Sequence, residues 1–123
     1  MKKLLFAGLI LWGLTSCSMM TMTTTPTQTA PLYSWNDYTE SSYQYYKKQT
    51  PEATERLMKT YGAMIKKQNG SRKALAPGIY AEYGYFLIQH GKKDEGVAML
   101  KKEKEIYPES SIFMDKLIKK FEQ

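Results

Sequence analysis

The stretch that decides the fold is residues 77–110, PGIYAEYGYFLIQHGKKDEGVAMLKKEKEIYPES. Pro77 opens it, Gly91 lies near its middle and Pro108 stops it, so a segment of helix length remains on each side of the glycine. Asp94 can cap the second segment. Both segments carry large apolar residues at helical spacing, namely Tyr80, Tyr83, Leu87 and Ile88 in the first and Val97, Leu100 and Tyr107 in the second. The stretch therefore predicts two antiparallel helices joined by a short turn.

Two further helices are predicted before this pair. Aromatic residues near helical spacing indicate one over Trp35–Lys48, with Ser34 or Asn36 able to cap its start. The next helix begins at residues 50–52 (Thr-Pro-Glu), where a capping hydroxyl precedes a proline at the first helical position and an acid in the first turn. Residues 69–70 (Asn-Gly) are predicted to end it.

A final helix is predicted after Pro108, starting at Ser110 or Ser111. Its apolar residues have the i, i+3, i+4, i+7 spacing of an amphipathic helix and are Met114, Leu117, Ile118 and Phe121. No segment shows the apolar–polar alternation of a half-buried strand. The predicted fold class is all-α, with about five antiparallel helices.

The same thirty-four residues, 77–110, resemble a tetratricopeptide repeat. Tyr80 occupies the first aromatic position, and small residues stand at Gly84 in the first helix and Gly96 in the second, where they would let the two helices approach. Glu103 departs from the alanine usual at its position. The resemblance implies stacked helical hairpins, with residues 35–68 as a divergent first hairpin and the last helix as a C-terminal cap. Such arrays usually need three or more units, so the first hairpin must act as a cap, or a partner or second copy must cover the open face.

The N-terminus has the features of a secretory signal. Lys2 and Lys3 precede eleven uncharged residues, 4–14, too few for a membrane span of about 20. Residues 14–17 (Leu-Thr-Ser-Cys) resemble the lipobox of bacterial lipoproteins, which implies cleavage after residue 16 and acyl chains, such as palmitate, on Cys17. Ser18 follows where an aspartate would favour the inner membrane, so the resemblance implies the outer membrane, facing the periplasm. The alternative is an ordinary signal peptide with a chance cysteine.

Three parts are thus predicted: a signal peptide (1–16), a lipidated N-terminus with a flexible tether (17–31), and one helical domain (32–123). The tether is threonine-rich and uncharged after Cys17. Its methionines, Met19, Met20 and Met22, are soft ligands for copper(I), but the chain has one cysteine and one histidine, and we expect no metal or other cofactor.

The charge pattern argues against nucleic acid as a partner. Removing residues 1–16 takes away two lysines and lowers the formal net charge from +6 to +4. The remaining basic residues form scattered pairs with acids between them, which is typical of solvated helix faces. One alternative function uses these pairs: a passive structural lipoprotein that contacts the cell wall.

A second resemblance covers nearly the whole domain. It is carried by Leu32, Tyr33, Trp35 and Tyr38 with Tyr43, by Pro77, Gly78, Tyr80 and Ala81, by Gly84 and Tyr85, and by residues 113–115 (Phe-Met-Asp). These are similar to a family of small proteobacterial lipoproteins of unknown function, often encoded beside a curli-secretion-type lipoprotein; Asn36 replaces the usual glycine. The resemblance implies a role in envelope assembly or secretion, with that lipoprotein or another envelope lipoprotein as partner.

The sequence holds no motif for catalysis. His90, the single histidine, has no nucleophile or metal-ligand spacing near it, and no phosphate loop is present. We therefore expect no enzymatic activity; the alternative is an envelope enzyme acting on peptidoglycan.

Two groups of residues are predicted to bind a protein partner. The first is the aromatic N-terminal segment, with Trp35, Tyr38 and Tyr43, because its rings cannot all share one helix face and tyrosine suits interfaces. The second is the concave side of the repeat, lined in register by Glu82, Tyr85 and Gln89. The expected function is that of a lipid-anchored periplasmic adaptor or assembly lipoprotein.

Overall fold

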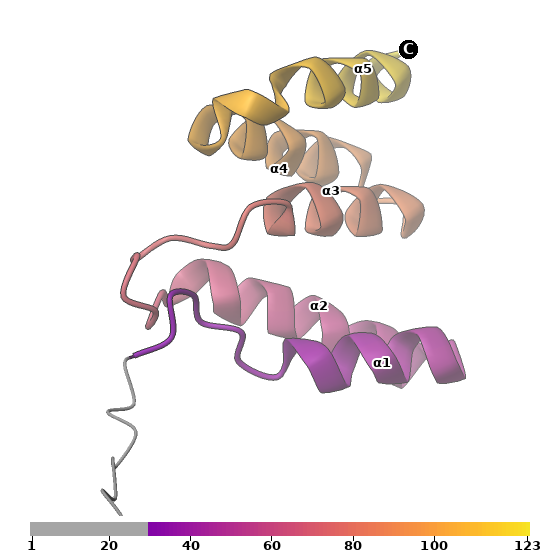
Figure 1. Ribbon diagram of the computed structural model, residues 1–123. Helices are drawn as coiled ribbons and strands as arrows, with labels where there is room; N and C mark the ends of the chain where they lie inside the picture. Colours follow the sequence, from indigo (N-terminus) through magenta and orange to yellow (C-terminus); the bar gives the residue numbers. More distant parts are fainter. Residues whose placement is uncertain (1–29) are drawn as a thin grey trace, which may run out of the picture.

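The computed structural model describes residues 30–123, which are all-helical. Its elements are α1 (Tyr38–Lys48), α2 (Pro51–Lys66), α3 (Ile79–Gln89), α4 (Lys93–Ile106), the 3₁₀ turn η1 (Pro108–Ser110) and α5 (Ser111–Glu122). Figure 1 shows them stacked in chain order, from α1 and α2 at one end to α5 at the other. Packing joins α1 to α2, α3 to α4 and α4 to α5. The predicted all-α fold of five helices in hairpins is confirmed.

The anchor lies outside this description. The predicted signal peptide, the lipidation residue Cys17 and the tether up to residue 29 are not among the described residues. Within residues 30–123, no helix combines the length and the apolar run that a bilayer crossing requires.

The start of α2 is as predicted, whereas that of α1 is not. The Thr50 side chain accepts a hydrogen bond from the Ala53 N–H at 3.2 Å, and Pro51 is the first helical residue. By contrast, α1 begins at Tyr38 rather than Trp35, because Asn36 has a φ of 46° and interrupts the helix. Neither Ser34 nor Asn36 caps α1; their side chains hydrogen-bond to each other at 2.9 Å.

Other predicted boundaries were also wrong by a few residues. Helix α2 ends at Lys66, because Lys67 is extended, rather than at residues 69–70. Helix α3 begins two residues after Pro77, because Gly78 has a φ of 91° that a helix cannot contain. Asp94 lies inside the first turn of α4 instead of capping it.

Glu103 supplies a hydrogen-bond acceptor for the backbone N–H of Gly78. Its side chain is only 2% exposed and reaches from α4 to the start of α3, where Oε1 accepts the Gly78 N–H at 2.6 Å. A carboxylate there satisfies one of the free N–H groups of a helix N-terminus and suits the helix dipole. Glu103, which departs from the repeat pattern, therefore caps the N-terminus of α3.

The predicted role of the two helix glycines is confirmed. A Cβ on Gly84 would lie 2.7 Å from the Gly96 carbonyl oxygen, and one on Gly96 would overlap the Gly84 carbonyl oxygen and lie 2.5 Å from Ile88 Cγ1. Helices α3 and α4 thus touch backbone to backbone at this crossing, which holds the second hairpin together.

Two apolar clusters form the core. The first lies between α2, α3 and the loop joining them and includes Leu57, Tyr61, Met64, Leu75 and Ile79. The second lies between α4 and α5 and consists of Val97, Leu100, Met114 and Ile118. The two hairpins meet through a layer of aromatic rings: Tyr61 stacks on Tyr83 with centroids 4.9 Å apart, and Tyr45 meets Phe86 edge-on at 5.2 Å.

Candidate partner-binding surface

Helices α1, α3 and α5 lie side by side and share one face of the stack. Tyr38 in α1 contacts Glu82 in α3, and Tyr85 in α3 lies 6.0 Å from the ring of Phe121 in α5. The first turn of α1 meets the first turn of α3, and Tyr45 near the end of α1 meets His90 after the end of α3. These helices therefore run parallel, with α2 and α4 returning between them.

The centre of this face is a carboxylate bound by two tyrosines. Glu82 Oε2 accepts the Tyr38 hydroxyl at 2.7 Å, and Oε1 accepts the Tyr61 hydroxyl at 2.8 Å. Because Tyr38 belongs to α1 and Tyr61 to α2, these two bonds connect both helices of the first hairpin to α3. Tyr61 is only 1% exposed. Burial, with the Glu82 carboxylate adding to it, raises the pKa of Tyr61 and of Tyr38 above the ordinary tyrosine value.

This network predicts a loss of stability in alkali. Because the pKa of Tyr61 is higher in the folded than in the unfolded chain, its contribution is complete below the unfolded value of 10.0 and declines as the pH rises above it. One such group lowers the free energy of unfolding by at most about 1.4 kcal/mol per pH unit. We expect Tyr61→Phe to reduce this slope, as measured by urea unfolding from about pH 9 to about pH 11. Parallel curves for the two proteins would contradict the assignment.

A groove runs beside this network, between α3 and α5. Its hollow of about 310 Å³ is lined by Ala81, Glu82, Tyr85, Phe113 and Leu117. Two of these rings are open to solvent, Phe113 at 62% and Tyr85 at 44% exposed. Large apolar side chains that stay exposed next to each other mark a surface able to bind another molecule.

The outer rim of the groove is basic. Lys116 and Lys120 follow Phe113 and Leu117 by three residues, which places them on the adjoining strip of α5. Lys120 Nζ lies 5.6 Å from the ring centroid of Phe121. An apolar ligand that carries an acidic group would meet complementary charge at this rim.

The structure brings some of the predicted partner residues together and separates others. Tyr38, Glu82 and Tyr85 lie on the shared face, and Gln89 is exposed one turn after Tyr85. The Tyr38 hydroxyl donates to the Glu82 carboxylate, so in the described part of the chain both side chains have a structural role. Partner binding by these residues stays a prediction.

The remaining two predicted residues lie elsewhere. Tyr43 stands two residues, or about 200° around the helix, from Tyr45, which faces α3. It therefore points away from the groove, and Lys47 Nζ lies 5.3 Å from the centroid of its ring. Trp35 is 43% exposed and packs against Tyr38 at the entry of the chain into the domain.

The sequence also contains a helical pattern that identifies Phe113 as a groove residue. Phe113, Leu117 and Phe121 are spaced by four residues, and this second stripe of α5 faces α3. The predicted apolar series of α5 included Leu117 and Phe121 but not Phe113, and its other two members, Met114 and Ile118, are buried against α4.

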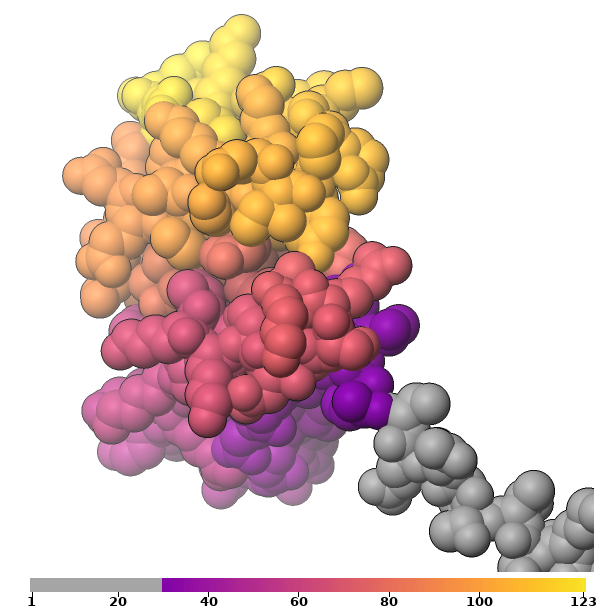
Figure 2. Space-filling view, turned by 90° about the vertical axis from the view of Figure 1, so that its left-hand side faces the viewer, coloured from indigo at the N-terminus to yellow at the C-terminus, as the bar shows by residue number. Residues whose placement is uncertain are grey.

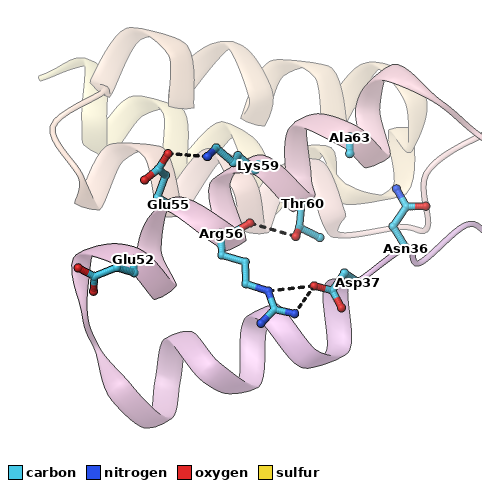
Figure 3. A pocket seen from close by; sticks show the side chains of 8 residues that line it. All are labelled: Asn36, Asp37, Glu52, Glu55, Arg56, Lys59, Thr60 and Ala63. Atoms are coloured by element: carbon cyan, nitrogen blue, oxygen red, sulfur yellow. Dashed lines mark hydrogen bonds and ion pairs between the residues drawn. The ribbon is translucent and has the colours of Figure 1, made fainter.

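Figure 3 shows a second hollow, of about 400 Å³, over α1 and α2. Four of its five charged side chains form ion pairs: Arg56 Nη2 lies 2.6 Å from Asp37 Oδ2, and Lys59 Nζ lies 2.6 Å from Glu55 Oε1. Because these four groups are ion-paired, they leave few free donors or acceptors for a ligand, and the groove between α3 and α5 is the better candidate.

The described part of the chain holds no group of three or more His, Cys, Asp or Glu arranged to bind a metal. His90 Nδ1 lies 2.7 Å from the Phe86 carbonyl oxygen, and its ring packs on Phe86 with centroids 4.3 Å apart. These contacts give the imidazole a structural partner at the end of α3.

Comparison with known proteins identifies a family. Residues 32–117 match the family model described as "Domain of unknown function (DUF4810)". No curated protein and no solved structure is significantly similar to the chain. The prediction that the chain belongs to a family of unknown function is therefore confirmed, whereas the match does not test the predicted lipoprotein character of that family.

Proposed function

Since the chain belongs to the DUF4810 family, whose name carries no activity, we propose its function from the groove between α3 and α5. The protein acts as a lipid-anchored periplasmic adaptor, held to the outer membrane by acyl chains on Cys17. The groove binds a short segment of another envelope protein, of which a curli-secretion-type lipoprotein is the first candidate. The helical hairpins serve as a tetratricopeptide-like scaffold that presents the groove.

The exposure of Phe113 beside Tyr85 is the observation that carries this proposal. Phe113 is 62% exposed although Leu117, one turn further along the same stripe, is partly buried. In tetratricopeptide-like arrays, the face formed by the first helix of each hairpin is the one that binds ligands, and here α1, α3 and α5 form it. A partner segment would cover both rings and complete their burial.

The dimensions of the groove define what it can bind. α5 has twelve residues and is about 18 Å long. An extended segment advances about 3.3 Å per residue, so about five residues would fill the groove. Such a contact is small, and we expect a modest affinity, with the segment carrying apolar residues and at least one acid for Lys116 or Lys120.

Site-specific photo-crosslinking in the native cell tests the proposal. A benzophenone amino acid placed at Phe113 is expected to give an adduct with one envelope protein, identified by mass spectrometry of the joined peptides. The same amino acid at Tyr43, which is also exposed but points away from the groove, is the matched control and is expected to give no such adduct. In the crosslinkable protein, the change Leu117→Asp should abolish the adduct by placing a charge in the groove.

Binding measurements then give the magnitude. With the identified segment as a peptide, Tyr85→Ala is expected to weaken binding about 30-fold, which corresponds to the 2 kcal/mol of a central interface residue. An adduct at Tyr43 alone, or none at either position, would refute the groove. Salt-dependent sedimentation with purified peptidoglycan would then favour the passive cell-wall function.

A further inference from the structure

The N-terminal segment is fixed to the domain before α1 begins. The Ser71 N–H donates to the Pro31 carbonyl oxygen at 3.0 Å, and the Arg72 N–H donates to that of Leu32 at 3.1 Å. Gly70 allows this close crossing, because a Cβ there would lie 2.5 Å from Tyr33 Cα. The point where the chain enters the domain is therefore set by backbone contacts.

Exposed apolar and basic side chains gather around this entry point. Leu32 is 59% exposed and Trp35 43% exposed. Arg72 and Lys73 are exposed beside them, and Arg72 Nη1 binds the Tyr33 hydroxyl at 3.2 Å. These residues belong to the side of the stack that faces the viewer in Figure 2, which holds the N-terminal segment and the loop between α2 and α3.

We propose that this edge, formed by Leu32, Trp35, Arg72 and Lys73, rests on the anionic surface of the membrane that carries the lipid anchor. The inference rests on the lipid attachment at Cys17 that belongs to the proposed function. Pro31 follows Cys17 by fourteen positions, a stretch that reaches at most about 50 Å when fully extended. The tether therefore joins the domain at this edge and keeps it within about 50 Å of the bilayer.

The chemistry of the edge fits that occupant. Tryptophan is enriched at the headgroup level of membranes, where its ring is partly apolar and its N–H finds a polar partner. Arg72 and Lys73 can bind lipid phosphates, and Asp37, the acid closest to Trp35 in the sequence, is already paired with Arg56. With this edge on the membrane, the helix ends on this side of the stack face the bilayer (Figure 1).

The chain supplies its own probe for this contact. Trp35 is the only tryptophan after residue 12, so it is the sole tryptophan of the mature protein. The lipidated mature protein is reconstituted into vesicles of phosphatidylethanolamine and phosphatidylglycerol that contain a phospholipid brominated near the headgroup. We expect the brominated lipid to quench Trp35 emission, and high salt to relieve the quenching.

Charge-neutral variants test the basic part of the edge. A basic residue near an anionic surface contributes about fivefold to association, so Arg72→Gln/Lys73→Gln should lower the ratio of docked to undocked domain about 25-fold. The matched control is Lys92→Gln/Lys93→Gln, which makes the same change in net charge at the turn between α3 and α4, on the opposite side of the stack. We expect this control to leave the quenching unchanged.

Vesicle flotation separates this inference from the anchor itself. Protein that floats with the vesicles but shows no quenching, or equal quenching in the wild type and in Arg72→Gln/Lys73→Gln, would overturn the docking of the edge while leaving the anchor in place. Native protein that fails to float would instead refute the lipid attachment, and with it both proposals.

Discussion

Replacing Gly96 with alanine is expected to lower the free energy of unfolding by about 3 kcal/mol, the upper part of the range for overpacked cores. The new methyl group would overlap the Gly84 carbonyl oxygen, which belongs to the backbone of the neighbouring helix and cannot rotate away. Relief requires α3 and α4 to separate, which would loosen the contact on which the second hairpin depends. Alanine's higher helix propensity stabilises the helix by about 1 kcal/mol, which is less than the cost of the overlap.

Gly62→Ala is the matched control, because it makes the same chemical change inside another helix. A Cβ on Gly62 would have no atom within 4 Å, so only the helix propensity acts, and we expect a gain of about 1 kcal/mol. Urea unfolding of the two variants beside the wild type measures both effects. Changes of the same sign in the two proteins would show that the crossing of α3 and α4 is not as close as described.

The features that local sequence could predict are those that depend on neighbouring residues. Thr50 and Pro51 act within one helical turn, so the start of α2 was predicted correctly. Gly84 and Gly96 were interpreted correctly because the repeat pattern contains the tertiary contact that they make. The start of α1 was wrong because Asn36 takes a positive φ while the segment around it is held by the loop at residues 70–72.

Contacts between distant residues were beyond prediction from sequence alone. Glu103 looked like a defect in the repeat, since nothing in α4 shows that the Gly78 N–H lies within reach of its side chain. Glu82 was assigned to an open concave surface, whereas two tyrosines from the first hairpin bind it. In both cases a carboxylate serves a hydrogen-bond donor that is more than twenty residues away in the sequence.

For the candidate surface, the general position was predicted and part of the composition was missed. Tyr85 was predicted from the register of the repeat, and the structure places it in the groove. Phe113 was missed, because a helix with two apolar stripes does not reveal which stripe a neighbour buries. That choice depends on α3 and α4 lying against α5 on different sides, which only the fold determines.

Tyr61→Ala is expected to have the largest effect of any substitution considered, a loss of about 4 kcal/mol, in the range for a buried aromatic cut to alanine. It removes a ring that is 1% exposed and stacks on Tyr83, and it leaves Glu82 with one of its two hydroxyl donors. Tyr61→Phe keeps the ring, and we expect it to lose only about 1.5 kcal/mol for the hydrogen bond to a charged group.

The position of Tyr61 also predicts where this damage appears. The second cluster, with Val97, Leu100, Met114 and Ile118, does not contain Tyr61, so α4 and α5 should keep their packing when the layer between the hairpins is opened. Amide hydrogen exchange should then show protection lost first in α1 and α2 and retained in α4 and α5. An equal loss in all five helices would mean that the hairpins unfold as one unit, and that the aromatic layer couples the two clusters too tightly for either to open alone.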